Sequence, residues 1–327
     1  MKAVVMQEGY TVALIDQPVP TIGDDDILVK TVAVAQNPTD WRHAAHLGKP
    51  GMVIGLDWSG RVIQTGKHVS APVVGQHVAG FVAGGTHAGS GAFAEYVKTP
   101  ADLVWEVPEG TLSDEEASTL GCAFWTAVQG LYAPGRLGLV EPPAKVEGER
   151  WVLITAAAVR IFNGHSAVRL TDHPLEASVG QFAIQLAHIS GYKVVTTASP
   201  RNLACLPPWA LTPYSITTIQ KCRRQGRACP LAHIGGEVRD DVEMMMTMVY
   251  TALGDAVDFG PEMRWSVSPE DRAHMVAFLK KVPKLVAEEK LKPNPVKLWE
   301  GGLAAVPEGL QHAREGKVRA EKIVYRV

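Results

Sequence analysis

Short apolar runs broken by Gly, Pro and Asp dominate the first hundred residues. Examples are KAVVM over 2–6, ILVKTVAVA over 27–35 and AFAEYVKT over 92–99. Runs of this length, rich in β-branched residues and bounded by turn residues, predict strands. Clustered glycines between residues 75 and 91 favour turns over helices. This part of the chain therefore predicts a partly open barrel or sandwich of antiparallel strands.

The pattern changes near residue 108. Ser113, with Glu116 three residues later, forms a capping box that predicts the start of a helix. From there to about residue 200 helical and strand patterns alternate, which indicates a parallel α/β sheet. Near the C-terminus, Ser268 caps another helix and AEKIVYRV over 320–327 predicts a last strand. A chain of 327 residues is long enough for two domains.

Bulk composition narrows the class of protein. Apolar residues make up 46% of the chain and charged residues 20%, as in globular proteins. A net charge of −2 gives no electrostatic reason to expect nucleic acid or an anionic membrane as a partner. No apolar run reaches the roughly 18–20 residues that cross a bilayer. The four cysteines form no C-x-x-C pair, so we expect neither a disulfide framework nor structural zinc, and a cytoplasmic location.

A dinucleotide site needs a strand, a turn of small residues and a helix N-terminus whose free N–H groups meet the pyrophosphate. Residues 151–154 supply the strand, and Ser178, Val179 and Gly180 open an amphipathic helix. Its apolar face is predicted at 179, 182, 183, 186 and 187, and Gly191 ends it.

The strand over 192–199 ends in a stretch that bears on the choice of cofactor. An acidic residue there would favour NADH, but the chain has Ser199, Pro200, Arg201 and Asn202. A hydroxyl and a cation suit a 2′-phosphate, so we expect NADPH. An ordinary surface turn remains the alternative for this stretch.

Several motifs together resemble the medium-chain dehydrogenase/reductase superfamily and its quinone-oxidoreductase-like branch. They are GLDWSGRVIQTG (55–66), VGQHVAGF (74–81), GAFAEYV (91–97), SVGQFAIQLAH (178–188) and AEKIVYRV (320–327). Within that branch, four further segments are similar to fungal trans-acting enoyl reductases of polyketide biosynthesis: AQNPTDW (35–41), GCAFWTAVQGLY (121–132), VYTALG (249–254) and residues 294–327.

The resemblance implies an α/β fold in two domains. A GroES-like, β-rich catalytic domain is expected over 1–125 and 262–327. A Rossmann domain with a doubly wound parallel sheet is expected over 126–261, interrupted by atypical segments at 159–176 and 203–232. The implied reaction transfers hydride from NADPH to the β-carbon of an enoyl thioester and then protonates the α-carbon.

The same resemblance implies the site residues. Cofactor contacts are expected at Asn37, Pro38, Thr39, Asp40, Ser178, Val179, Gly180, Ser199, Pro200, Arg201, Asn202, Val318 and Arg319. The acyl pocket is expected at Gly121, Cys122, Ala123, Phe124, Trp125, Thr126, Ala127, Val128, Val249, Tyr250, Thr251, Ala252 and Leu253. The 121–128 and 249–253 segments could equally be core packing, and the NPTD stretch a Pro-initiated turn. Asp40 and Tyr250 are candidate proton donors with water as the third source, and nothing in the sequence chooses between them.

Metal ligands are missing at the expected positions. Zinc-dependent relatives carry a cysteine and a Gly-His-Glu motif where this chain has Asn37 and Gly55-Leu56-Asp57. The chain is therefore predicted to use no metal.

Residues 159–176 lie where the resemblance predicts a tight turn. Without them the flanking residues read VLITAAAASVGQFAIQLAH, a continuous strand–turn–helix. An insert of this length fits a short unspliced intron, and we favour that origin over a genuine loop that uses His165 and His173. Residues 203–232 depart as well: they hold three of the four cysteines, and their composition fits a shifted reading frame. Tyr214 there does not match the pattern around the family's cofactor-contacting tyrosine.

Three functions follow from these observations. The first is an NADPH-dependent enoyl reductase acting in trans on an acyl thioester held by a polyketide synthase, as a monomer or homodimer. The second is a stand-alone quinone or alkenal reductase. The third is a degraded, non-catalytic copy, because a Rossmann sheet without central strands leaves edges unpaired.

Overall fold

The structure is a computed structural model of residues 1–327. It describes all of them except 88, 155–157, 162–165, 170–176, 197–242 and 260–263. The chain divides into two compact units, Met1–Trp125 with Val249–Val327 and Thr126–Met248. Ser199–Asn202, most of the insert and residues 203–232 lie outside the described residues, so the predictions made there stay untested.

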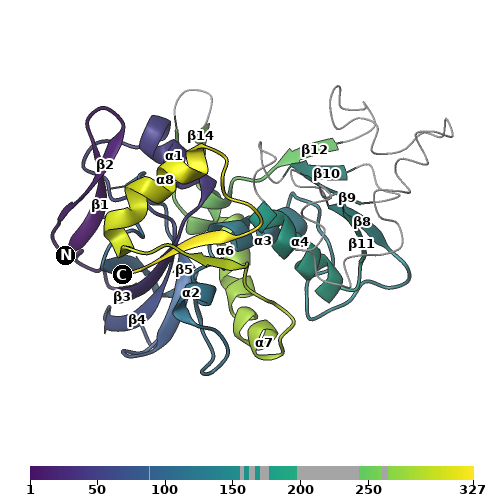
Figure 1. The fold of residues 1–327 in the computed structure, drawn as a ribbon. Helices are drawn as coiled ribbons and strands as arrows, with labels where there is room; N and C mark the ends of the chain where they lie inside the picture. The colour runs from purple at the N-terminus through teal and green to yellow at the C-terminus, as the bar shows by residue number, and fades with distance from the viewer. Residues whose placement is uncertain (88, 155–157, 162–165, 170–176, 197–242, 260–263) are drawn as a thin grey trace. The chain divides into compact units, whose positions relative to one another are not determined.

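The first unit is built on a seven-stranded sheet of order β15-β16-β3-β4-β5-β7, with β6 paired to β3. Figure 1 shows the C-terminal β16, in yellow, beside the N-terminal part of the chain, and the register pairs Val324 with Ala35. The strands are β3 (Asp26–Ala35), β4 (Asp57–Thr65), β5 (His77–Phe81), β6 (Tyr96–Pro100), β7 (Val104–Glu106), β15 (Val296–Leu298) and β16 (Lys322–Arg326), with a separate hairpin of β1 (Lys2–Gln7) and β2 (Thr11–Asp16). Within this unit all described pairings except β15–β16 are antiparallel, as the sequence predicts for the first hundred residues.

Alternating apolar positions on these strands bury one large core. Trp58, Phe93 and Tyr325 are fully buried in it, and Leu310 packs against it from helix α8. The helices of this unit are α1 (Pro38–Arg42), a π-helix η1 (His43–Leu47), α2 (Asp114–Ala117), α6 (Pro269–Leu279), α7 (Val282–Ala287) and α8 (Val306–Arg314), with 3-10 turns η2 (Ala101–Leu103), η5 (Val249–Leu253) and η6 (Gly302–Ala305). A short hairpin joins β13 (Val257–Asp258) to β14 (Arg264–Trp265).

Two predicted helix starts are confirmed. Ser113 Oγ accepts from the N–H of Glu116 at 3.2 Å, and the Glu116 carboxylate accepts from the N–H of Ser113 at 2.9 Å. Ser268 Oγ accepts from the N–H of Asp271 at the start of α6. These caps satisfy N–H groups that the first helical turn leaves without partners.

The chain returns to the first unit at Val249, whereas the sequence prediction places that boundary after residue 261. The reason is packing by η5. The hydroxyl of Thr251 donates to Asp271 in α6 at 2.5 Å, and the ring of Tyr250 meets Phe81 of β5 edge-on at 5.6 Å.

The second unit has a mixed five-stranded sheet of order β11-β8-β9-β10-β12. Its strands are β8 (Trp151–Ile154), β9 (Ala158–Ile161), β10 (Ser166–Arg169), β11 (Lys193–Thr196) and β12 (Glu243–Met246). The β8–β11 and β10–β12 pairs are parallel, as expected, but both pairings of β9 are antiparallel. The sheet is mixed rather than wholly parallel because β9 and β10 come from the segment inserted between β8 and the following helix.

That helix, α4 (Ala177–Ile189), buries the predicted face. Val179, Phe182, Ala183, Leu186 and Ala187 are each at most 5% exposed. It ends as predicted at Gly191, whose φ of +83° suits a residue without a Cβ. The helix α3 (Cys122–Tyr132) begins in the first unit and ends in the second. No helix in the described part of the chain has the length and apolar character needed to cross a membrane.

Candidate functional site

Asn37 and Asp40 form a closed turn where β3 leads into α1. The backbone N–H of Asn37 donates to Asp40 Oδ2 at 2.6 Å, and the N–H of Asp40 donates to the Asn37 carbonyl at 3.0 Å. Pro38 begins the helix, where its missing N–H costs nothing. Both polar side chains are buried, at 4% and 0% exposed. The NPTD stretch is thus a Pro-initiated turn with an Asp cap, held inside the protein.

A buried cation links this turn to two other elements. The ammonium of Lys322, the first residue of β16, donates to Asn37 Oδ1 at 2.6 Å and to Asp57 Oδ2 at 2.7 Å. Lys322 is 2% exposed and Asp57 fully buried. Asp57 Oδ1 in turn accepts from the N–H of Cys122, the first residue of α3, at 2.6 Å. Charged groups are rarely buried unless they are paired, and here the ammonium and the carboxylate pair with each other. The network is therefore part of the buried core of the first unit.

Aromatic rings surround a second group of polar atoms. His43 Nδ1 lies 2.8 Å from the carbonyl oxygen of Gly84, and His43 Nε2 lies 3.3 Å from the hydroxyl of Tyr250. The ring of Tyr250 packs edge-on against Phe81 and Phe259, with centroids 5.6 and 5.3 Å away. Burial lowers the pKa of His43 to about 4, so its ring is neutral at pH 7.

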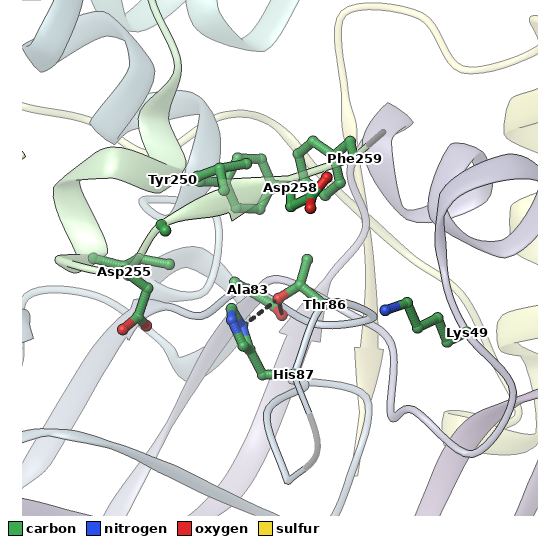
Figure 2. Close-up of a pocket in the computed structure, with 11 residues that line it drawn as sticks. Lys49, Ala83, Thr86, His87, Tyr250, Asp255, Asp258 and Phe259 are labelled. Carbon is green, nitrogen blue, oxygen red and sulfur yellow. Dashed lines mark hydrogen bonds between the residues drawn. The ribbon is translucent and has the colours of Figure 1, made fainter. Parts of the chain in front are cut away.

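A cavity of about 470 Å³ opens beside Tyr250 in the first unit. Figure 2 shows Tyr250 and Phe259 on one side of it, Thr86 and His87 facing them, and Lys49 and Asp255 at opposite ends. The other lining residues are Ala83, Leu253, Ala256, Val257 and Asp258. The wall therefore mixes aromatic and aliphatic side chains with polar and charged ones, and Figure 2 shows Asp258 between Tyr250 and Phe259.

The predicted acyl-pocket residues divide into two groups. Tyr250 and Leu253 line the cavity, whereas Val249, Thr251 and Ala252 are buried beside them. No residue of 121–128 is among the cavity's lining residues. Within that segment Phe124 packs against Phe278, Trp125 meets Phe81 edge-on, and Ala127 and Val128 are fully buried.

The predicted cofactor residues also fall in different places. Asn37 and Asp40 belong to the buried turn, and Ser178, Val179 and Gly180 lie in the first turn of α4. Val318 packs against the core of the first unit, while Arg319 is exposed.

Sequence reasoning missed the parts of the site that depend on tertiary structure. No local pattern marked His43, most residues of the cavity wall or a role for Lys322, although Lys322 lies in the AEKIVYRV segment that contributes to the resemblance. Lys322 had one available signal, because it is a charged residue within a strand whose next three residues are all buried.

Ser59, His77 and Asp114 come together without forming a hydrolytic triad. Ser59 Oγ and Asp114 Oδ1 both lie 2.8 Å from the same nitrogen, His77 Nε2. A triad needs the carboxylate on one ring nitrogen and the hydroxyl on the other. Arg61 also binds Asp114, at 2.8 Å, so the cluster is a structural one at the start of α2.

The comparisons with known proteins agree with the fold. Residues 23–109 match the alcohol dehydrogenase GroES-like domain. The chain is 31% identical to "Trans-enoyl reductase ACTTS2" of Alternaria alternata, over 100% of this chain and 98% of that one. It is 32% identical to "Trans-enoyl reductase resD" of Aspergillus sclerotiorum over the full length of both. Among solved structures, the quinone oxidoreductase from Coxiella burnetii superposes with a TM-score of 0.65 at 23% identity, covering 100% and 99% of the two chains.

Both the fold and the full-length similarity to curated proteins therefore place the chain in the medium-chain dehydrogenase/reductase superfamily, within its family of fungal trans-enoyl reductases.

The residues present do not fit the catalytic zinc of some superfamily members. Zinc is held by thiolate, imidazole and carboxylate groups. Asn37 and Leu56 offer no such ligand, and Asp57 is already bound to the ammonium of Lys322 and the N–H of Cys122. Within the part of the chain that the structure describes, no three His, Cys, Asp or Glu side chains gather at ligand distance.

Proposed function

We propose that this chain is an NADPH-dependent, zinc-independent enoyl reductase that acts in trans on an acyl thioester carried by a polyketide synthase. The cavity beside Tyr250 carries the proposal. Its volume of about 470 Å³ is large enough for a small-molecule substrate, and Tyr250, Leu253 and Phe259 give it an apolar part against which an acyl group can pack. The names of the full-length relatives supply the reaction and the kind of partner.

NADPH, when bound, supplies the hydride that adds to the β-carbon of the enoyl thioester. The residues of the chain bind the cofactor and the substrate and orient them toward each other. The N-terminal turn of α4, with Ser178, Val179 and Gly180, offers free N–H groups to a pyrophosphate. The turn from Asn37 to Asp40 borders the nicotinamide, and Ser199, Arg201 and Asn202 take the 2′-phosphate.

Tyr250, Leu253 and Phe259 hold the conjugated acyl group in this proposal. Their apolar surface excludes water from the reacting carbons. Orientation of the two reactants contributes more than acid–base strength in a hydride transfer, because no strong base is needed to start it.

The test is NADPH oxidation by the purified chain with enoyl-thioester mimics, compared with quinones and simple alkenals. We expect turnover with the thioesters and NADPH, and much slower turnover with NADH. Faster reduction of quinones than of every thioester would support the stand-alone reductase instead. If the acyl chain is delivered in trans, adding the polyketide synthase that carries it should raise the rate of NADPH oxidation.

A non-catalytic copy is a second candidate, favoured by one observation. The strand β9 lies beside β8 in the sheet and β10 lies beside β9, although the family's tight turn into the helix is expected directly after β8. A thermal-shift titration with NADPH separates the two functions. Saturating cofactor at about 100 times its Kd should stabilise an active fold by about 2.7 kcal/mol, and an unchanged melting temperature would favour the non-catalytic copy.

A further inference from the structure

The buried ammonium of Lys322 and its partner Asp57 join three separate segments of the described first unit. The ammonium reaches Asn37 ahead of α1 and Asp57 at the start of β4, and Asp57 reaches the first N–H of α3. Along the chain, Asn37 lies 285 residues before Lys322 and Asp57 lies 265 residues before it. One side chain from the last strand therefore ties together elements formed early in the sequence.

The link to α3 leaves almost no freedom. Asp57 Oδ1 accepts the N–H of Cys122 at 2.6 Å, a length typical of a charge-assisted hydrogen bond. A Cβ added at Gly121 would meet the same carboxylate. The carboxylate is thus enclosed by the helix start on one side and by the ammonium on the other. A shift of the ammonium would move the carboxylate, and with it the first turn of α3.

The link to Asn37 fixes the orientation of an amide. An ammonium has three donors and no acceptor, so it must face the oxygen of Asn37 and not the nitrogen. Asn37 Nδ2 therefore points the other way, where it is buried without a hydrogen-bond partner among the described residues. Leaving a buried donor unpaired costs about 1–3 kcal/mol. This N–H group can therefore donate to an ordered water or to a bound ligand.

We infer that Lys322 is a positioning residue of the proposed reductase: its buried ammonium fixes Asn37 beside the nicotinamide and, through Asp57, fixes the start of α3. The inference rests on the proposed function, since it assumes that the Asn37 turn borders the cofactor. It also puts a cation of the chain beside Asn37 and Asp57, two positions at which zinc-dependent relatives are expected to carry their metal motif. The ammonium organises the site and touches neither reactant.

The test separates stability from positioning. Lys322→Met leaves the charge of Asp57 buried without an opposite charge. Asp57→Asn leaves the charge of Lys322 in the same state. Each single variant should lower the melting temperature by roughly 5–10 °C. The double variant Lys322→Met/Asp57→Asn removes both charges and keeps an oxygen for the N–H of Cys122. We expect its melting temperature to return to within about 3 °C of the original, because a charge pair and its neutral replacement often have similar stability.

Activity should not return with stability. In the double variant Asn37 still lacks its ammonium, so kcat should stay at least about 10-fold low, while KM for the enoyl thioester stays within about 3-fold. Lys297→Met on the neighbouring β15, which removes a half-buried ion pair with Glu321, is the matched control and should change neither quantity. A stable double variant with the original kcat would overturn the positioning role alone. An original chain that reduces no enoyl thioester would instead overturn the proposed function, and the positioning role with it.

Discussion

Tyr250 donates its hydroxyl hydrogen to His43, and the surroundings of His43 fix that direction. The carbonyl of Gly84 can only accept, so the nitrogen 2.8 Å from it, His43 Nδ1, carries the ring hydrogen. Because burial keeps the ring neutral, with a pKa of about 4, Nε2 is left as an acceptor. The hydroxyl of Tyr250, 3.3 Å away, is the only group in this pair that can donate. Burial also raises the pKa of Tyr250 well above its ordinary value.

We predict from this arrangement that Tyr250 is not the proton donor of the reduction. Its hydrogen is engaged by His43, and a raised pKa makes the phenol a weaker acid. Tyr250→Phe keeps the edge-on contacts with Phe81 and Phe259 and should lower kcat by less than about 10-fold, with water supplying the α-carbon proton. The measurement is steady-state kinetics with an enoyl thioester. General acid catalysis contributes about 10²–10⁴-fold, so a loss in that range would assign the proton to Tyr250.

A second prediction concerns the contact of α3 with the buried carboxylate. Gly121→Ala would place a methyl group on the carboxylate of Asp57 and should destabilise the protein by about 1–3 kcal/mol, as overpacking does. The matched control is the same substitution in an Asp57→Ala background, where the methyl group has space. Denaturant unfolding of the four proteins gives the coupling, and equal costs of Gly121→Ala in both backgrounds would contradict the predicted contact.

The sequence was sufficient for features that depend on neighbouring residues. The capping box of Ser113 and Glu116 and the apolar face of α4 follow from spacing alone, and both are as predicted. The turn from Asn37 to Asp40 could be found because Pro and Asp have strong local preferences.

The remaining features depend on distant parts of the chain. The ammonium of Lys322 meets Asn37 only because β16 pairs with β3, and no local pattern records that pairing. The cavity brings together Lys49, Thr86 and Tyr250 from segments that are far apart in the sequence. The mixed sheet was not predicted for another reason. Strands as short as β9 and β10 show too little hydrophobic periodicity to be recognised, and the family resemblance predicts a turn at this place.

Filling the cavity should weaken substrate binding without affecting the fold. Leu253 lines the cavity and is only half-buried, so Leu253→Trp can extend its ring into the space. We expect KM for a long-chain enoyl thioester to rise by about 10-fold or more, and KM for a short-chain one to change little. The NADPH-induced thermal shift should be unchanged, which serves as the control. An equal effect on short and long substrates would place the acyl chain elsewhere.

The last prediction is a pH dependence of stability that originates at Asp40. Burial raises the pKa of this carboxyl well above its usual range, against the opposing effects of the N–H of Asn37 and the ammonium of Lys322; the nearby charge of Asp57 raises it further. The folded state then holds a proton that the unfolded state has released, so Asp40 stabilises the protein at low pH. This stability is lost as pH rises through the raised pKa of the folded state.

Asp40→Asn should remove that dependence. The amide is neutral at every pH, and its oxygen can still accept from the N–H of Asn37 at the place of Asp40 Oδ2. We expect the difference in unfolding free energy, original minus variant, to fall steadily as pH rises from the ordinary pKa of an aspartate through the raised pKa of the folded state. Asp24→Asn, which alters an exposed pair with Lys67, is the control and should give a difference that hardly changes with pH. A difference that instead rises with pH would mean that Asp40 is ionised in the folded protein, because its attraction to the ammonium of Lys322 outweighs its burial.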